Sequence, residues 1–597
     1  MVTVRVLGRA CLLGAAVLIA AIAAANCGGG GGGAGGSGTA AGTGGGAGGA
    51  AAGASAPGGA SSGSAGTGSG GTNTGSTDAG NPASGPASGG TTVSPTHDML
   101  TYHNDIARTG QNLNETTLTP ANVNSSTFGK LGFFSVDGKV DAQPLYVGAL
   151  AIAGGTHNVL YVATENDSVY AFDADSGATL WQMRTLNTGE TPSDDLGCSQ
   201  IVTTIGITST PVIDRSRGEH GAIYVVAMSK DASGGYHHRV HALDLATGAE
   251  LLNGPTEVAA TYRGTGAGNI NGTMSFTPAL YAERAALLLL GGTLYTSWTS
   301  HCDKGGYTGW IIGYDAGTLR QNNVLNVTPN GLGGAIWMSG AGPASDGSSI
   351  YLLDANGTFD TTLTSAGFPN QSDFGNAFLK IGTTNGLTVT DYFAMSNVVN
   401  EARDDIDLGS GGALVLPDLA DASGAVQHLA LGAGKDNIIY VVNRDSMGKF
   451  NPSGDNIHQE IAAQLVGGEF GMPAYFNGRV YFGSVGDHLK AFTLTNALLS
   501  TTPTAQSAMS FPYPGTTPGI SANGSANGIV WAAENGSVAA LHAFDPVTLA
   551  ELYNSNQMGT RDQFGAGNKF ITPTIANGKV YVGTTKGVAV FGLLSGG

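Results

Sequence analysis

A strand-turn-strand unit recurs along this chain, and no other feature constrains its fold as strongly. The clearest copy is LYVATENDSVYAFDADSGATLW, which runs from Leu160 to Trp181. Both predicted strands are rich in β-branched and aromatic residues, and the turns contain Asp, Asn, Ser and Gly. Related pairs of strands begin at Ile223, Leu294, Val480, Val530 and Val580. Repetition of one such unit predicts a solenoid or a propeller.

A second pattern sets the phase of the repeat, because a proline opens the first strand of most units. The prolines stand in Gln143-Pro144, Thr210-Pro211, Thr277-Pro278, Gly342-Pro343, Met472-Pro473 and Thr572-Pro573, while Gly411-Gly412 and Ile520-Ser521 occupy the two gaps. This spacing predicts about eight units, roughly 50 to 70 residues apart, with seven units as the alternative. The last unit, Ile571 to Phe591, has room for three strands only. We therefore expect Lys130 to Val136 (KLGFFSV) to supply its outer strand and to close the ring.

These strands and turns resemble the pyrroloquinoline-quinone (PQQ)-type repeat, whose pattern is near VYVGT-x-G-x-VYALD-x-x-TG-x-x-x-W. The resemblance extends over most of Asp98 to Gly592. The stretch from Thr101 to Val123 is similar to the first segment of the quinoprotein alcohol dehydrogenase-like superfamily, and SHCDKGGYTGWIIGYDA resembles a secreted bacterial subgroup. The resemblance implies an all-β, eight-bladed PQQ-type β-propeller. It does not decide the function, because the superfamily contains both dehydrogenases and non-enzymatic propellers.

The N-terminal region predicts export. Met1 to Cys27 resembles a lipoprotein-type signal peptide, since its apolar stretch, Leu12 to Ala25, is too short and too early to span a membrane. Cys27 is the predicted site of lipid attachment, which would hold the protein at the outer membrane, in the periplasm or on the cell surface. Cleavage by an ordinary signal peptidase is the alternative and would give a secreted protein. Gly28 to Pro95 is a Gly/Ala/Ser-rich, low-complexity segment that predicts a disordered tether, followed by the propeller over residues 96–597.

Charge and cysteine content restrict the classes of function. The net charge of −18 argues against nucleic acid as a partner, because phosphate binding needs clustered Lys and Arg. Cys198 and Cys302 follow Cys27 in the chain, and such a pair in an exported protein predicts a disulfide. The sequence has neither a CxxCH haem motif nor adjacent cysteines, and both absences count against an electron-transferring enzyme. We expect a monomer.

The long loops of the chain are expected on one face of the ring. If the strands of a blade are named A to D from the axis to the rim, the D-to-A connections and the B-to-C loops emerge on the same face. We call this the loop-rich face. The long segments are the D-to-A connections Gln182 to Gly206, Gly382 to Gly409 and Asp445 to Glu469, and the B-to-C loops Ser297 to Gly309 and Asp354 to Phe374. We expect a protein or small-molecule ligand to bind on this face, at the mouth of the channel.

Six residues are candidates for ligand contact on that face. They are Glu165, His301, Asp303, Trp337, Asp405 and Asp407. His301 or Asp303 could ligate a metal, but a loop held by the disulfide and by hydrogen bonds is the favoured interpretation. The acidic stretch from Glu401 to Asp407 could bind calcium, but it lacks the spacing of an EF-hand and is more typical of a solvated loop. The sequence therefore predicts no metal site and no catalytic residue.

His237, Arg239 and His241 lie on one face of a predicted strand, because side chains alternate along a strand. A metal site is conceivable there. His241, however, aligns with Tyr170 and His542 in other units, and a position that alternates between Tyr and His favours a packing role.

Two functions fit these observations. The first is an exported, lipid-anchored propeller that acts as a binding or scaffold module through its loop-rich face and needs no cofactor. The outer-membrane assembly lipoprotein of bacteria has a similar plan. The alternative is a PQQ- and calcium-dependent quinoprotein dehydrogenase of alcohols or sugars, in which the quinone lies in the channel. That resemblance implies a Glu among the calcium ligands and a Trp below the ring, and Glu165 and Trp337 stand at suitable positions.

Overall fold

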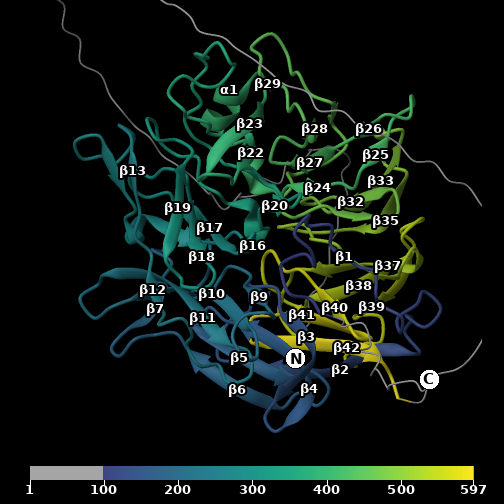
Figure 1. Cartoon of the computed structure of the whole chain (residues 1–597). Coiled ribbons are helices and arrows are strands. Elements are labelled where there is room, and N and C mark those ends of the chain that lie inside the picture. The colour runs from purple at the N-terminus through teal and green to yellow at the C-terminus, as the bar shows by residue number, and fades with distance from the viewer. Residues whose placement is uncertain (1–97, 596–597) are drawn as a thin grey trace, which may run out of the picture. The chain divides into compact units, whose positions relative to one another are not determined.

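The protein is a ring of β-sheets that follow one another in chain order. The computed structural model describes residues 98–595, and within this range eight sheets of four or more strands form the blades of a propeller (Figure 1). The predicted all-β, eight-bladed architecture is confirmed, and the seven-bladed alternative is wrong. The predicted signal peptide, Met1 to Cys27, and the tether, Gly28 to Pro95, lie outside the described residues. None of the helices within 98–595 is long and apolar enough to cross a membrane.

The strands of each blade succeed one another from the axis to the rim. Blade 1 contains β3 (Leu145–Ile152), β4 (Gly155–Ala163), β5 (Ser168–Asp173) and β6 (Thr179–Arg184). Blade 2 contains β9 (Val212–Asp214), β10 (Ala222–Lys230), β11 (Tyr236–Asp244) and β12 (Thr256–Glu257), joined at one end by β7 (Thr191–Asp194) and β8 (Thr204–Ile205). Blade 3 contains β15 (Tyr281–Glu283) and β16 (Leu288–Leu290), then β17 (Thr293–Ser300), β18 (Trp310–Asp315) and β19 (Gln321–Asn326). Blade 4 contains β20 (Ala344–Ser345), β21 (Ser349–Leu353), β22 (Phe378–Gly382), β23 (Thr388–Ala394) and β29 (Lys449–Phe450).

The second half of the ring repeats this order. Blade 5 contains β24 (Leu414–Val415), β27 (Leu429–Ala433), β28 (Ile439–Asn443) and β30 (Gln459–Ile461). Blade 6 contains β31 (Ala474–Phe476), β32 (Arg479–Phe482), β33 (His488–Thr495), β34 (Leu498–Leu499) and β35 (Ala505–Ser510). Blade 7 contains β1 (Gln111–Asn112), β36 (Gly519–Asn523), β37 (Ala526–Glu534), β38 (Ala540–Phe544) and β39 (Glu551–Asn554). Blade 8 contains β40 (Thr574–Ala576), β41 (Lys579–Gly583), β42 (Gly587–Leu593) and β2 (Phe128–Ser135).

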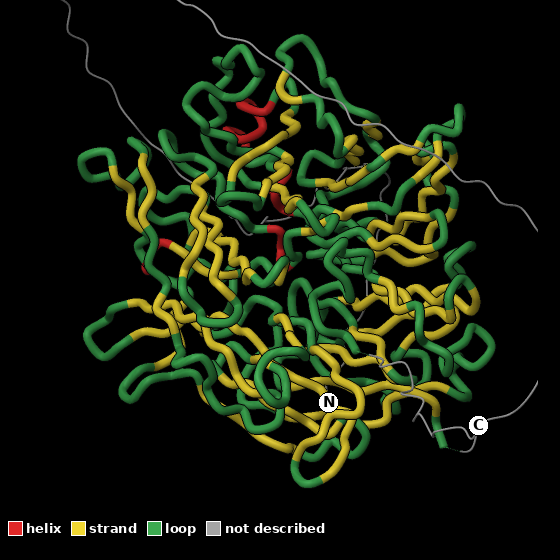
Figure 2. Tube along the Cα trace, viewed as in Figure 1, coloured by secondary structure: helices red, strands yellow, loops and turns green. Residues whose placement is uncertain are grey.

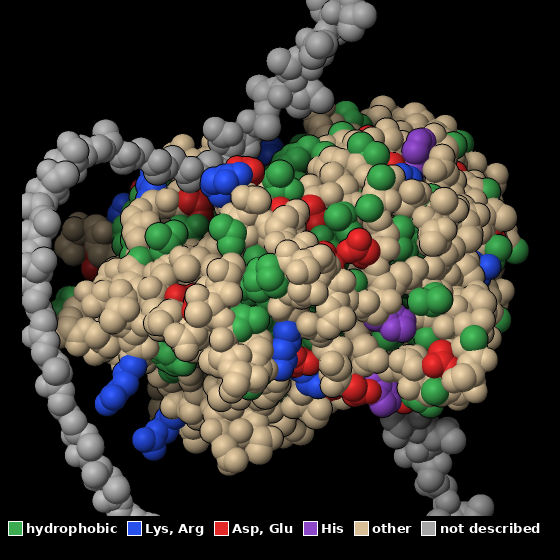
Figure 3. All heavy atoms as spheres, turned by 90° about the horizontal axis from the view of Figure 1, so that it is seen from above, with side chains coloured by type: hydrophobic (Ala, Val, Ile, Leu, Met, Phe, Trp, Pro, Cys, Tyr) green, Lys and Arg blue, Asp and Glu red, His purple; other side chains and the backbone are tan. Residues whose placement is uncertain are grey.

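The remaining elements are short and lie in the connections. They are the hairpins β13 (Thr261–Arg263) with β14 (Thr273–Ser275) and β25 (Leu419–Ala420) with β26 (Val426–Gln427), the helix α1 (Val398–Asp404), and the 3-10 turns Pro278–Leu280, Met338–Gly340 and Leu408–Ser410. Figure 2 shows how little of the molecule is helical. On the side of the molecule seen in Figure 3, charged side chains are few and scattered, as expected for a chain with 11% charged residues.

The proline pattern and the predicted closing strand are both confirmed. Five innermost strands, β3, β9, β20, β31 and β40, begin directly after the marked prolines. Proline suits this position because it cannot donate a hydrogen bond to the sheet. The third unit differs, since Pro278 starts a 3-10 turn and β15 begins at Tyr281. β2 pairs antiparallel with β42, with Phe134 opposite Val588, so N-terminal chain supplies the outer strand of blade 8 (Figure 1).

A tyrosine in the repeated B strand joins neighbouring blades. Its hydroxyl donates a hydrogen bond to a carbonyl in the C-to-D turn of the next blade. These bonds run from Tyr161 to Leu245, from Tyr224 to Ala316 and from Tyr481 to Pro546, with oxygen–oxygen distances of 2.7, 2.6 and 2.7 Å. The recurrence of Tyr in the sequence unit therefore has a structural cause, since a buried hydroxyl needs a partner.

Residues 99–112, which we call the channel segment, lie inside the ring and reach every blade (Figure 1). The segment bonds to the innermost strands or to the residues directly before them. The bonded pairs, for blades 1 to 8, are Met99 with Tyr146, Leu100 with Ile213, Arg108 with Leu287, Ile106 with Ser345, Ala107 with Val415, Thr109 with Tyr475, Gly110 with Ile520 and Asn112 with Ile575. Near one end of the segment, Asp98 pairs with Arg215, and beyond the other end Glu115 accepts from Gly578. Both partners lie in A-to-B turns, so the chain at both ends of the segment lies on the face opposite the loop-rich face.

Buried polar bonds hold the channel segment in shape. The Arg108 guanidinium is fully buried and donates to the carbonyls of Tyr102, Leu287 and Pro343. Burial lowers the pKa of Arg108 to about 10. Gly110 has a φ of +74°, and a Cβ there would lie 2.4 Å from the His103 ring. Only glycine fits this close approach.

Candidate functional site

A cavity of about 510 Å³ lies on the loop-rich face. Its lining includes Gln200, Trp337, Val399, Phe470, Tyr513 and Phe570 from the D-to-A connections and Asp303, Tyr307, Asn356 and Lys435 from the B-to-C loops. Four of the six predicted ligand-contact residues line it, namely Asp303, Trp337, Asp405 and Asp407. The cavity is of the size that small-molecule sites usually have.

One side of the cavity is an aromatic wall, formed by Trp337, Phe470, Tyr513 and Phe570. The ring centroids of Phe470 and Tyr513 are 5.8 Å apart, and those of Tyr513 and Phe570 are 6.5 Å apart. Two cations lie against these rings. The Arg284 guanidinium is 4.4 Å from the centre of the Phe570 ring and 5.8 Å from that of Trp337, and the Lys569 ammonium is 6.0 Å from both Tyr513 and Phe570.

A second part of the lining is an acidic wall, formed by the segment that contains α1 together with Lys435. The Lys435 ammonium pairs with Asp405 at 2.7 Å and with Asp407 at 2.6 Å. Burial alone would lower the pKa of Lys435, but the two carboxylates raise it. Burial also raises the pKa of Asp407, an effect that Lys435 partly offsets. These two carboxylates therefore share one ammonium group as their partner within the protein.

Two predicted residues, Glu165 and His301, do not line the cavity. Glu165 is buried in the B-to-C loop of blade 1, where its carboxylate accepts from the Gly206 amide at 2.8 Å and the Thr208 hydroxyl at 3.0 Å. The His301 ring contacts the carbonyl oxygens of Asp194, at 3.0 Å, and Ala279, at 3.3 Å. Its contacts hold the loops beside the cavity together, as the sequence interpretation of SHCD favoured.

The predicted disulfide is present between Cys198 and Cys302, whose Cα atoms are 5.8 Å apart. It joins the connection before blade 2 to the B-to-C loop of blade 3, at the edge of the cavity. Gln200 and Asp303, which line the cavity, lie close in the chain to the two half-cystines and contact each other at 3.5 Å. The disulfide therefore fixes one edge of the cavity.

Comparisons of the sequence find no relative, since no protein-family model and no curated protein matches the chain. Solved structures do match. Quinohemoprotein alcohol dehydrogenase from Comamonas testosteroni aligns with a TM-score of 0.54 and 15% identity, over 84% of this chain and 81% of its own. Quinohemoprotein alcohol dehydrogenase ADHIIG from Pseudomonas putida HK5 gives 0.53 and 13%, over 83% and 80%. A europium-containing methanol dehydrogenase gives 0.51 and 13%, over 83% and 98%.

This is the fold of the PQQ-type propellers. At such low identity the likeness shows the fold alone, so the chemistry of this protein has to be argued from its own cavity.

The residues that line the cavity can be compared separately with the PQQ molecule and with the calcium ion that accompanies it in quinoprotein dehydrogenases. PQQ is a planar ring system that carries carboxyl groups, and the aromatic wall with Arg284 and Lys569 suits such a molecule. Calcium takes six to eight oxygen ligands. Among residues 98–595, no group of three or more His, Cys, Asp or Glu side chains is placed to hold a metal ion. The ring and acid groups of the quinone therefore fit these residues, whereas no cluster of acidic side chains within residues 98–595 is placed to hold its calcium.

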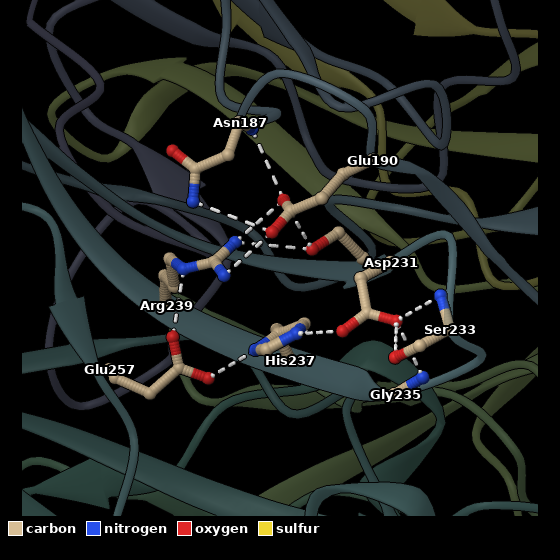
Figure 4. Close-up of polar contacts among 9 residues, drawn as sticks. Asn187, Glu190, Asp231, Ser233, Gly235, His237, Arg239 and Glu257 are labelled. Carbon is tan, nitrogen blue, oxygen red and sulfur yellow. Dashed lines mark hydrogen bonds and ion pairs between the residues drawn. The ribbon is translucent and has the colours of Figure 1, made fainter.

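His237 and Arg239 belong to a network of polar side chains outside the cavity. Arg239 forms a bidentate pair with Glu190, with both N–O distances 2.8 Å, and a third bond with Glu257 (Figure 4). His237 bridges Glu257 and Asp231. His241, in turn, pairs with Glu250 at 2.8 Å. Because Glu190 belongs to the connection that continues to Cys198, the network fastens this connection to blade 2.

Two of the predicted loop boundaries are wrong. The segment Gly382 to Gly409 contains β23, and Asp445 to Glu469 contains β30, so each includes an outer strand as well as the connection. Neither strand contains the Trp that closes the repeat unit in β6, which is why the sequence did not separate them from the loops.

The sequence predictions missed most of the aromatic wall, although a signal for it exists. Phe470 and Phe570 each stand three residues before a marked proline, and Tyr513 directly precedes Pro514. Trp337 was predicted because it lies close to the start of an A strand. The same criterion would have found Phe470 and Phe570. Arg284, which follows β15 on the inner strand of blade 3, has no comparable signal.

Proposed function

We propose that this protein is an exported binding module, anchored through an acyl chain on Cys27, that holds a planar, acidic small molecule in the cavity of its loop-rich face. The aromatic wall with its two cations carries the proposal. Aromatic rings offer flat apolar contact, and Arg284 and Lys569 offer charge for acid groups at the same surface. The disulfide and the channel segment support it, because the disulfide gives the cavity a fixed edge and the segment bonds to the inner part of every blade.

Binding without turnover is favoured by the state of the acidic wall. Asp405 and Asp407 are both paired with Lys435, and Asp303 accepts from the Tyr307 hydroxyl at 2.9 Å. A dehydrogenase would need a carboxylate that is available as a base and oxygen ligands for calcium. The three carboxylates of this cavity are committed to partners within the protein.

Titration of the purified protein with PQQ, used as a probe for planar acids, is expected to quench tryptophan fluorescence at one molecule per chain. The Trp337→Phe variant should lose the response, and Arg284→Gln should weaken binding about tenfold, the effect of losing roughly 1.4 kcal/mol of charge and ring contact. Trp181→Phe, in the outer strand of blade 1, is the matched control and should keep the full response.

The same titration separates binding from catalysis. With calcium, an alcohol or sugar and a redox dye added, we expect no dye reduction. Calcium-dependent reduction of the dye, with one quinone bound per chain, would instead favour the quinoprotein dehydrogenase. A failure of PQQ and of other planar acids to bind would contradict the assignment of the cavity as a small-molecule site.

Anchoring is tested at the N-terminus. Mass spectrometry of the mature N-terminal peptide is expected to find a diacylated Cys27 as the first residue, and the protein should partition with membranes. Cys27→Ala should abolish acylation and release the protein. An unmodified peptide that begins at Asn26 would favour the secreted alternative.

A further inference from the structure

The helix α1 separates the cavity from a buried acidic group. Val399, Ala402 and Arg403 line the cavity, whereas Val398 and Glu401, on the other face of the same helix, are buried. Glu401 is only 6% exposed. One wall of the cavity is thus a single short helix whose inner face carries a carboxyl group.

The surroundings of Glu401 contain like charges. Its Oε1 accepts from the side-chain amide of Asn397 at 2.9 Å. The Asn376 side chain also lies close enough to lower the pKa of Glu401, although the effect is smaller than that of burial. Asp436 and Asp455, from the two loops of blade 5 behind α1, act on it electrostatically. Asp455 itself accepts from the Ser396 amide, at 2.6 Å, directly before the helix.

The remaining groups at this place do not compensate a charge on Glu401. The Tyr440 hydroxyl donates to Asp436 at 2.6 Å, and Glu460 adds a further carboxyl group beside Asp455. Lys435 is engaged by Asp405 and Asp407 on the cavity side. Arg403 turns outward to Asp404, at 2.8 Å. Ionisation of Glu401 would therefore place a negative charge between acidic neighbours and under a wall of the cavity.

We propose that residues 396–407 form a pH-responsive wall, which is seated while the Glu401 carboxyl is protonated and loosens when Glu401 and Asp436 are ionised beside Asp455. The proposal concerns regulation of the cavity on which the proposed function depends. Binding in the cavity would then be tighter in mildly acidic surroundings than in alkaline ones.

The direction of the effect follows from the titration of the two groups. Burial, reinforced by Asp436, raises the pKa of Glu401 to about 7, and burial raises that of Asp436 to about 6. A carboxyl group whose pKa is raised in the folded state stabilises that state only while it is protonated. The seated wall is therefore most stable below the ordinary carboxyl pKa of about 4, loses stability as the pH rises through 6 and 7, and changes little above that.

Hydrogen exchange of the full chain, measured by mass spectrometry without ligand, tests the wall directly. Between pH 5.5 and pH 8, after correction for intrinsic exchange, protection of the peptide over residues 396–407 should fall on the order of tenfold. In the Glu401→Gln variant this peptide should keep most of its protection at pH 8. In the Asp436→Asn variant, which removes the neighbouring charge, the peptide should keep part of its protection. Glu283→Gln is the matched control, since Glu283 is also buried but lies in blade 3, and it should behave as wild type.

Equal protection of this peptide at both pH values, or an undiminished loss in Glu401→Gln, would overturn the proposal. If one of the two variants, Glu401→Gln or Asp436→Asn, fails to fold, hydrogen exchange of the other still tests the proposal. The exchange measurement needs no ligand, so it can fail or succeed independently of the PQQ titration. Failure of the proposed function and failure of the pH response are therefore distinguishable.

Discussion

A chain that lacks residues 100–136 is expected not to form a closed, cooperatively folding ring, whereas a chain that lacks residues 28–95 should melt at the wild-type temperature. The first deletion removes β2, which leaves β42 as an open sheet edge. It also removes nearly all of the channel segment and its bonds to the eight blades. The second deletion removes a segment whose Gly/Ala/Ser composition cannot form a core.

Buried side chains give the size of the effect. Tyr102, Leu118, Val123, Phe128 and Phe134 are all buried in the ring. At about 2 kcal/mol for each apolar side chain, the loss is roughly 10 kcal/mol, which is comparable to the whole stability of a typical domain. Differential scanning calorimetry and size-exclusion chromatography would measure it. Similar melting temperatures for the two deletions would contradict closure by N-terminal chain.

The second large effect is expected from loss of the disulfide. The bond closes a loop with a sequence separation of 104, which corresponds to about 4 to 5 kcal/mol in the chain-entropy model and often less in practice. Replacement of both cysteines, Cys198→Ser with Cys302→Ser, should lower the free energy of unfolding by a few kcal/mol. Because the bond fixes the edge of the cavity, binding of the planar probe should weaken at temperatures where the ring is still folded.

Chemical denaturation with and without reductant measures this change. Reductant should destabilise the wild type and leave the double variant unaffected, since the variant has no bond to break. Thiol counting under denaturing, non-reducing conditions should find neither Cys198 nor Cys302 free. Two free thiols at these positions would refute the bond, and with it the account of the fixed cavity edge.

The repeat made the propeller predictable, and the reason is physical. Strands that are buried almost throughout alternate with polar turns in unit after unit. The closing strand followed from a last unit that was one strand short. The path of the channel segment was not predictable in the same way. Most of its hydrogen bonds involve backbone groups, as at Ile106 and Ala107. Because every residue has these groups, the side chains of the segment do not indicate which strands it contacts.

The site was predicted in part for a related reason. Topology placed the long loops on one face, and Asp303, which belongs to one of these loops, lines the cavity. Trp337, which was named for its place near the start of an A strand, lines it as well. Glu165 was named for its place in a B-to-C loop, but burial against Gly206 and Thr208 withdraws it from the cavity. Which loop residues turn inward depends on how connections from different blades pack together. That information lies in pairs far apart in the chain, such as Arg284 and Phe570.

The channel segment has a consequence for how this sequence can evolve. Repeat proteins commonly change length when a unit is duplicated or lost. In this ring, one unit more or fewer would give a channel of different width, and the same short stretch of chain could no longer bond to all of the innermost strands. The number of repeat units in this chain is therefore matched to the length of the channel segment, whereas the length of the loops on the loop-rich face is under no such restriction.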